Sequence, residues 1–425
     1  MKLVCILLLL VASVTFSAVF SGGSGAESDP YQISTAAQLD YIGTSTANFD
    51  KHYILINDID LSAYTGTSFH EIGYYNYPNS YGFTGSFDGN GFTIDNFEYD
   101  GAIKYSGFFS YIDGGTVKNL NFTNAYVSTG GQDTCGVICG FANSGSIINC
   151  SVSGSVSGDE YIGGIIGTSK ADLQFCSFNG TVTGRRYVGG IAGNQSSSGG
   201  ISGCYANVNL TVSSEAGGGI AGKLTGQIEK CFTEGTIQGG QEVGGIAGYE
   251  YNQYAVITNC YSAASVTGSY DVGGIVGLCS GYYIGSGLYA TLTNCYFRGT
   301  CNVGPIFGHF EEANVSGLLY DSDVFGSTSA YWEVWCPGKT TPQMQQLSTF
   351  TDAGWDFSRT GAWRIREGDY PILDWQPINT TEELQRIADF ASQWMSEGAA
   401  LSCDMNNDSI VNYFDWTYMS SMWGQ

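Results

Sequence analysis

A six-residue motif of glycine and aliphatic residues recurs five times in this chain. It reads VGGIAG at 188–193 and 243–248, and near-copies read IGGIIG at 162–167, GGGIAG at 217–222 and VGGIVG at 272–277. Successive copies begin 26 to 29 residues apart. Because a catalytic loop is not repeated five times, a motif at this spacing predicts an architecture of stacked, similar units.

A second segment with a different period precedes the hexapeptides. In the first of these segments, Cys150, Val152 and Val156 fall on alternate positions, whereas Ser153 and Ser155 fall between them. Such alternation is typical of a strand with one buried face and one face in water. The cysteines that begin these segments are Cys150, Cys176, Cys204, Cys231, Cys260 and Cys295.

The hexapeptide does not follow a period of two. Val188 and Ile191 are three positions apart, so they share a strand face only if the glycines between them form a bulge or corner. Glycine suits a corner because it accepts positive φ and leaves room for neighbouring backbone.

A repeat of about 27 residues with two short strands and glycine corners predicts one coil of a β-solenoid. Stacked coils lie roughly 4.8 Å apart, so the six cysteines are expected to form one internal column. A β-propeller blade needs about 40 residues, which is longer than this repeat.

The pattern NCYS at 259–262, VTG at 266–268 and VGGIVG at 272–277 resembles the GLUG repeat family of exported bacterial proteins. The resemblance implies an all-β fold, a right-handed parallel β-helix, over roughly residues 30–375. It also implies an extracellular or surface protein with a structural or adhesive role. The family has no agreed catalytic residues to transfer to this chain.

The first residues have the layout of a secretory signal peptide. An apolar run follows Lys2 and continues to Val14, and small residues come after it. No later stretch is long and apolar enough to span a membrane. The sequence therefore predicts an exported protein, located outside the cell or on its surface.

The solenoid ends should carry short capping helices. Thr35 and Gln38 form a capping-box pattern that predicts a helix at the N-terminal end, and TPQMQQL at 341–347 predicts one near the C-terminal end. We expect a signal peptide at 1–26, an N-terminal cap and first coils at 27–100, GLUG-like repeats at 101–320, a C-terminal solenoid cap at 321–375 and a small α-helical module at 376–425.

The last module contains the spacing of a calcium-binding loop. Oxygen ligands at loop positions one, three, five and twelve, with a backbone carbonyl at position seven, surround Ca²⁺ in such loops. The segment resembles one repeat of a dockerin, which implies a cohesin-like or other surface protein as partner. An acidic N-capped helix without metal is the alternative. The expected ligands are Asp404, Asn406, Asp408, the carbonyl of Ile410, and Asp415.

Charge and the scattered polar residues narrow the function classes. The formal net charge of −24 repels phosphate backbones, which excludes nucleic-acid binding. The repeats contain isolated charges rather than a clustered acid and base, so no catalytic residues are assigned. These charges are Asp159, Glu160, Arg185, Arg186 and Glu242, and the three histidines, His52, His70 and His309, lie far apart and are expected to be structural.

Three functions therefore remain open. The first is a secreted or surface structural and adhesive β-helix, attached through the dockerin-like end. The second is a carbohydrate-active β-helix enzyme, a polysaccharide lyase or hydrolase. The third is a flat-face binder of glycan or ice through outward Ser and Thr columns, which Asn209, Gln238 and Asn302 interrupt.

Overall fold

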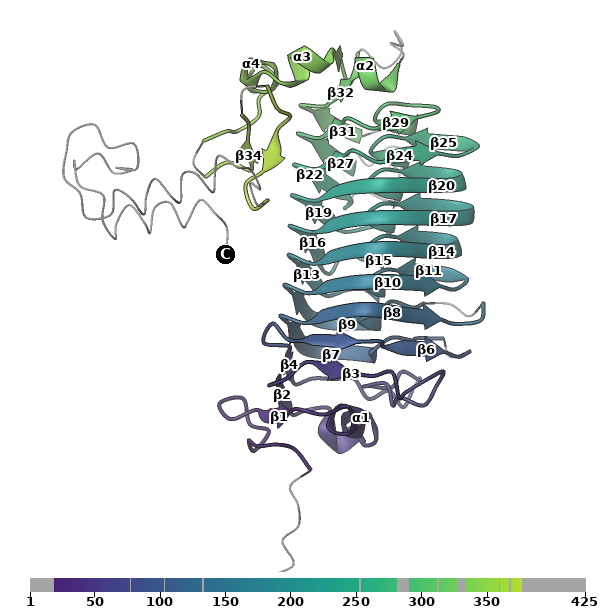
Figure 1. The fold of residues 1–425 in the computed structure, drawn as a ribbon. Helices are drawn as coiled ribbons and strands as arrows, with labels where there is room; N and C mark the ends of the chain where they lie inside the picture. Colours follow the sequence, from purple (N-terminus) through teal and green to yellow (C-terminus); the bar gives the residue numbers. More distant parts are fainter. Residues whose placement is uncertain are drawn as a thin grey trace, which may run out of the picture.

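The chain folds into a parallel β-solenoid (Figure 1). The structure, a computed structural model, describes residues 19–376 except 77, 103, 132–133, 252–253, 281–289, 312, 327–333, 359 and 367. It is 52% strand and 7% helix, with about eight turns stacked along one axis. The predicted parallel β-helix is therefore confirmed.

Two large parallel sheets form the flanks of the stack. The first, sheet 1, contains β1 (Tyr31–Ile33), β2 (His52–Leu55), β4 (Ser86–Asp88), β7 (Phe109–Lys118), β9 (Cys139–Ile148), β12 (Ile166–Ser169), β13 (Asp172–Gln174), β15 (Ala192–Gln195), β16 (Gly200–Ser202), β18 (Ala221–Leu224), β19 (Gln227–Glu229), β21 (Ala247–Tyr251), β22 (Val256–Thr258), β26 (Val276–Ser280), β27 (Ala290–Thr293), β30 (Phe307–Phe310) and β31 (Ala313–Ser316).

The second, sheet 2, contains the longer strands that follow the cysteines. Its members are β3 (Ile59–Asp60), β5 (Thr93–Asp95), β6 (Glu98–Asp100), β8 (Asn121–Ser128), β10 (Ser151–Ser157), β11 (Glu160–Gly163), β14 (Ser177–Gly189), β17 (Tyr205–Gly218), β20 (Phe232–Gly244), β23 (Tyr261–Ser262), β24 (Ser265–Thr267), β25 (Tyr270–Gly273), β28 (Tyr296–Phe297), β29 (Thr300–Cys301), β32 (Leu319–Asp321) and β33 (Gly338–Lys339). A separate antiparallel pair is β34 (Trp363–Arg364) with β35 (Ile372–Leu373).

Short helices lie at both ends of the stack, as the capping motifs predict (Figure 1). Helix α1 (Ala36–Gly43) begins after Thr35, whose side chain accepts the N–H of Gln38, and it buries Leu39 and Ile42. The other helices are η1 (Thr46–Asn48), α2 (Ser322–Phe325), α3 (Thr341–Met344) and α4 (Leu347–Thr351). No helix in the described part of the chain has the length and apolar character needed to span a membrane.

The register of neighbouring coils explains why the hexapeptides are unevenly spaced. Strand β14 pairs with β17 in parallel, and Val182 lies beside Leu210, 28 positions later. The register shifts between Gly184 and Arg186, so that Val188 lies beside Gly217, 29 positions later. A bulge therefore absorbs the variation in coil length, and the buried columns remain aligned.

The hexapeptide forms the corner between the two sheets, as predicted. Its glycines are needed because neighbouring backbone leaves no room for a Cβ atom. Strand β14 ends at Gly189 and β15 begins at Ala192. A Cβ on Gly189 would lie 2.0 Å from the carbonyl oxygen of Ala192. Positive φ belongs instead to the residue before the hexapeptide, for example Tyr187 at φ 54°. The expectation that these glycines supply positive φ is therefore wrong; close backbone approach excludes larger residues.

The six cysteines form the predicted internal column. All are buried, and their thiols do more than fill space. The backbone N–H of Cys176 donates to Sγ of Cys204 at 3.4 Å, and that of Cys204 donates to Sγ of Cys231 at 3.3 Å. The thiols of Cys204, Cys231 and Cys260 thus each satisfy a buried backbone donor at a corner, a role that the alternating pattern does not reveal.

We predict that these thiols are reduced and protected. The eleven cysteines in the described residues are unbridged, and Cys301 alone among them is partly exposed. Burial raises the pKa of the Cys204 and Cys260 thiols well above the ordinary value, so these two groups carry little of the reactive thiolate. Thiol counting without reductant should find few reactive groups in native protein and nearly all in denaturant. Fewer than half the thiols free after denaturation would contradict this.

Candidate functional site

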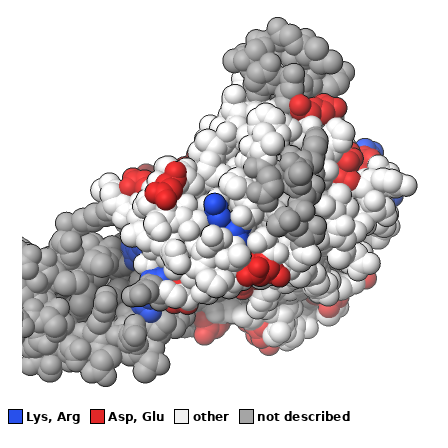
Figure 2. All heavy atoms as spheres, turned by 90° about the horizontal axis from the view of Figure 1, so that it is seen from above, with Lys and Arg blue, Asp and Glu red and all other residues white. Residues whose placement is uncertain are grey.

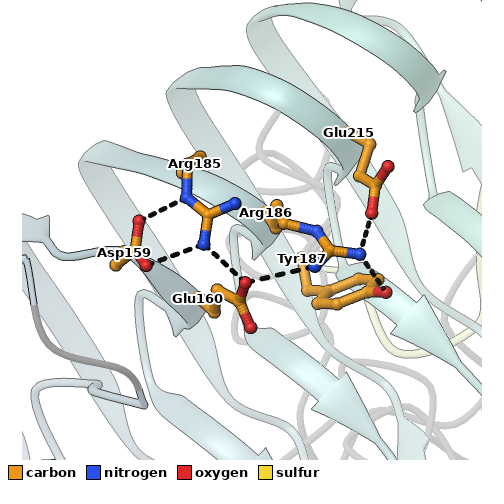
Figure 3. Close-up of polar contacts among 6 residues, drawn as sticks. All are labelled: Asp159, Glu160, Arg185, Arg186, Tyr187 and Glu215. Atoms are coloured by element: carbon orange, nitrogen blue, oxygen red, sulfur yellow. Dashed lines mark hydrogen bonds and ion pairs between the residues drawn. The ribbon is translucent and has the colours of Figure 1, made fainter.

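A cluster of ion pairs lies on the outer surface beside the hexapeptide corners (Figure 3). Arg185 on β14 donates through Nε and Nη2 to both carboxylate oxygens of Asp159, at 2.7 and 2.9 Å, and Nη2 also reaches Glu160 at 2.6 Å. Arg186 pairs with Glu160 at 3.2 Å and with Glu215 on the next coil. The Arg185 guanidinium lowers the pKa of the Asp159 carboxyl. Charges that look isolated in sequence are therefore joined across three coils.

Aromatic rings complete this cluster. Tyr161 and Tyr187 stack with ring centroids 4.9 Å apart, and the Arg186 guanidinium and Lys223 ammonium lie 5.0 and 5.3 Å from the Tyr187 centroid. One coil further on, burial together with the charges of Glu215 and Asp271 raises the pKa of Glu242 to about 7. Because the arginines are engaged with carboxylates and rings, we interpret the cluster as a brace between coils.

The three histidines lie in separate places, as predicted. His52 contacts Ser86 Oγ at 2.8 Å, and His70 contacts Asp40 at 3.0 Å. His309 lies 3.7 Å from Asp271. Among the described residues, no three His, Cys, Asp or Glu side chains gather closely enough to hold a metal ion.

The outward Ser and Thr columns exist on sheet 2. One column follows the register from Ser155 through Thr181, and the column is interrupted at Asn209, as the sequence indicates. It continues with Thr236, Ser265 and Thr300. Side chains bond along it, for example Thr300 to Ser265 Oγ at 2.9 Å. This gives one narrow hydroxyl-rich strip of mixed side-chain types.

A polar pocket of about 120 Å³ opens where sheet 1 turns into sheet 2, in the N-terminal half of the stack. Its lining includes amides and hydroxyls, and its rim includes the ring of Phe175, of which 53% is exposed. Asn149 Nδ2 donates to Asn119 Oδ1 at 2.9 Å, and Asn119 Nδ2 donates to Asp88 Oδ1 at 3.0 Å. The lining residues are Gly91, Asn119, Asn121, Asn149, Cys150, Ser151, Phe175 and Ser177.

The first residue of each long sheet 2 strand changes from polar to aromatic towards the C-terminal half of the stack. The position after each corner is Ser151 and Ser177 beside the pocket, then Tyr205, Phe232 and Tyr261 further along. The Phe232 and Tyr261 rings stack with centroids 4.9 Å apart. This change from serine to aromatic residues was not predicted from the sequence, although the residue after each column cysteine shows it.

A C-terminal strap, residues 355–376, covers the aromatic part of this column. Figure 1 shows β34 of the strap beside the stack. The Trp363 indole donates to Asn259 Oδ1 at 3.0 Å, and the Trp375 indole donates to the carbonyl of Lys230 at 2.8 Å. Lys230 also pairs with Asp374 at 3.0 Å. Among the described residues, the strap meets the lining of the polar pocket at Trp375, whose ring centroid lies 6.4 Å from that of Phe175.

The predicted calcium ligands lie outside the described residues. They are Asp404, Asn406, Asp408, Ile410 and Asp415, and the described residues end at 376. The calcium site and the dockerin-like module therefore stay predictions.

Comparisons with known proteins find partial matches. No family model matches the chain, so membership of the GLUG family stays a prediction. Halomucin of Haloquadratum walsbyi is 39% identical over 211 residues, which cover 48% of this chain and 2% of that protein. A protein of Evansella cellulosilytica, named as a candidate Gly-rich membrane protein, is 38% identical over 148 residues, 32% of this chain and 16% of that protein. The chain thus matches only a small part of each relative.

One solved structure has a related shape. It comes from Bacteroides ovatus and is named as a candidate immunoglobulin A1 protease. The TM-score is 0.45 at 22% identity, and the match covers 84% of this chain and 96% of the other. A likeness at this level carries no argument about activity.

Proposed function

We propose that this protein is a secreted or cell-surface β-helix with a structural and adhesive role. The observation that carries the proposal is the use of the repeated residues: the cysteines, the aliphatic side chains and the hexapeptide glycines are all consumed in stacking one coil on the next. The residues that recur from coil to coil therefore build a rigid scaffold.

The surface chemistry supports this role. Seen from above, the charged side chains of the described residues lie in small separate groups, with uncharged surface between them (Figure 2). An acidic protein with such a surface resists nonspecific attachment to polyanions and suits selective contact with neutral material. The matches to halomucin and to a protein named for a membrane further support placement at the cell surface.

We also propose that the scaffold itself has no catalytic activity. The arginines nearest to acidic groups, Arg185 and Arg186, are held in ion pairs. The raised pKa of Glu242 follows from burial and from the neighbouring carboxylates Glu215 and Asp271. Turnover of pectin or alginate by purified protein, abolished by one carboxylate substitution, would contradict this proposal.

Cell fractionation tests the proposed location directly. Antibodies against the solenoid should detect the protein in the envelope or the medium of the cells that produce it, with an N-terminus near residue 26. Surface protease treatment of intact cells should remove the envelope fraction. An unprocessed protein confined to the cytoplasm would refute the proposal.

We propose that residues 376–425 attach the solenoid to a cohesin-like or other surface partner by a calcium-dependent module. Calorimetry on the full chain should detect one weak site, with a Kd of about 10⁻⁴–10⁻³ M as expected of extracellular modules. Asp404→Ala and Asp415→Ala should each abolish the heat, because each removes a ligand carboxylate. Asp352→Asn, outside the loop, is the control. Equal heats of calcium binding from the wild type and all three variants would contradict the calcium assignment.

A further inference from the structure

Phe175 stands at the corner directly before a column cysteine, where most other coils have Asn or Gly. Its φ is 53°, in the left-handed region, where a bulky side chain is strained. Lys230 stands at an equivalent corner and is neither Asn nor Gly. Its side chain forms an ion pair with Asp374 of the C-terminal strap, and its carbonyl accepts the Trp375 indole N–H. The remaining equivalent corners hold Asn119, Asn149, Gly203, Asn259 and Asn294.

Burial does not compensate for the strain at Phe175. The side chain is 53% exposed, which is unusual for a large ring at the edge of a well-packed stack. One side of the ring lies over Gly203, where an added Cβ would come within 2.6 Å of it. Its neighbour Trp375 meets it edge to face at 6.4 Å. By contrast, the strained Tyr161 and Tyr187 stack on each other.

The pocket beneath this ring is polar and uncharged. The hydrogen bonds from Asn149 to Asn119 and from Asn119 to Asp88 fix both amides in one orientation. Among the described residues, Oδ1 of Asn149 and the hydroxyl of Ser177 then have no hydrogen-bond partner. Beside the exposed ring, the Asn149 amide oxygen can accept a hydrogen bond, and the Ser177 hydroxyl can donate or accept one. None of the eight lining residues carries an ionised side chain at neutral pH.

We propose that this pocket is a binding subsite for a neutral glycan chain. One face of a pyranose ring stacks on Phe175, and its hydroxyls bond to Asn149 Oδ1 and Ser177. A water molecule needs about 10–15 Å³ of such volume, so the pocket of about 120 Å³ accepts the edge of one sugar, and the rest of the chain lies outside. The inference rests on the adhesive role proposed above and names its ligand class.

Affinity electrophoresis of the full chain tests the subsite. The gels contain soluble neutral polysaccharides, namely β-glucan, galactomannan, xylan or dextran, and at least one should retard the wild-type protein. Phe175→Asn installs the residue found at the equivalent corners. It should weaken binding at least tenfold by removing the ring, yet raise Tm by relieving the strained backbone. Phe175→Trp should keep binding within about threefold because it keeps a platform.

Two further variants provide a control and a second test of the subsite. Tyr270→Asn removes another exposed ring, on β25, and should bind like the wild type. Ser177→Ala should weaken binding without lowering Tm. The proposal is overturned if no neutral polysaccharide retards the wild type, if Phe175→Asn binds as the wild type does, or if it loses Tm along with binding. None of these outcomes changes the location of the protein, so this test and the fractionation test fail independently.

Discussion

Replacing Gly189 by alanine should strongly destabilise the solenoid. The new Cβ would lie 2.0 Å from the carbonyl oxygen of Ala192, and the next coil's Gly222 nitrogen is at 2.9 Å. Both obstacles are backbone, which cannot move without breaking the ladder between coils. We expect a loss of about 3 kcal/mol or more in the free energy of unfolding, at the upper end for overpacking. Urea unfolding followed by circular dichroism measures it.

The same coil offers a matched control. Gly200 on β16 has ordinary contacts at its Cβ position, the nearest being the Gln227 carbonyl oxygen at 3.7 Å, and its φ is not in the left-handed region. Gly200→Ala should change stability by less than about 1 kcal/mol. If both variants unfold at the same urea concentration as the wild type, the corner is looser than its contacts indicate.

Replacing Glu250 by glutamine should stabilise the protein at alkaline pH and leave it nearly unchanged at pH 5. The carboxyl is fully buried, and its only described contact is the Cys279 thiol at 2.8 Å. Burial raises its pKa from 4.5 to about 8. Between these values the folded protein keeps a proton that the unfolded chain releases, so stability falls as pH rises through this window.

The expected size follows from the shift. Each unit of pKa difference corresponds to about 1.4 kcal/mol, so Glu250→Gln should be about 4 kcal/mol more stable than wild type at pH 8. Urea midpoints between pH 5 and pH 9 measure the difference. Glu229→Gln, at an exposed position on β19, should reproduce the wild-type profile. A wild-type profile that does not decline towards pH 8 would show that Glu250 is hydrated or paired in solution.

The stacking scheme was predictable because it depends on local periods. Alternation after Cys150 and Cys176 predicts an inward column, and both residues are buried. The capping pattern at Thr35 predicts α1. These features require only the geometry of a strand or of one helical turn, so neighbouring residues in the chain are enough to indicate them.

The candidate site was not predictable for a physical reason. The pocket and the strap bring together residues far apart in sequence, such as Trp375 and Lys230, which are 145 positions apart. No local period relates them. The backbone strain at Phe175 is also hidden: the cysteine that follows it aligns this residue with Asn149 and Gly203, but only the structure shows that the position is left-handed. Likewise, Tyr187 rather than a glycine takes the left-handed conformation at the hexapeptide.

Deleting one whole coil tests most directly whether this chain is a stack of interchangeable units. Removing residues 176–203, 28 positions from Cys176 to Gly203, joins Phe175 to Cys204 and lets β10 pair with β17. The account predicts a folded, cooperatively unfolding protein that is shorter by about 4.8 Å, the spacing of one strand. Small-angle scattering and urea unfolding measure both properties. Removing only residues 190–203, half a coil, should abolish folding, because it removes β15 and β16 and places the sheet 2 strands of later coils on the side of sheet 1. Equal loss of structure in both deletions would contradict the account.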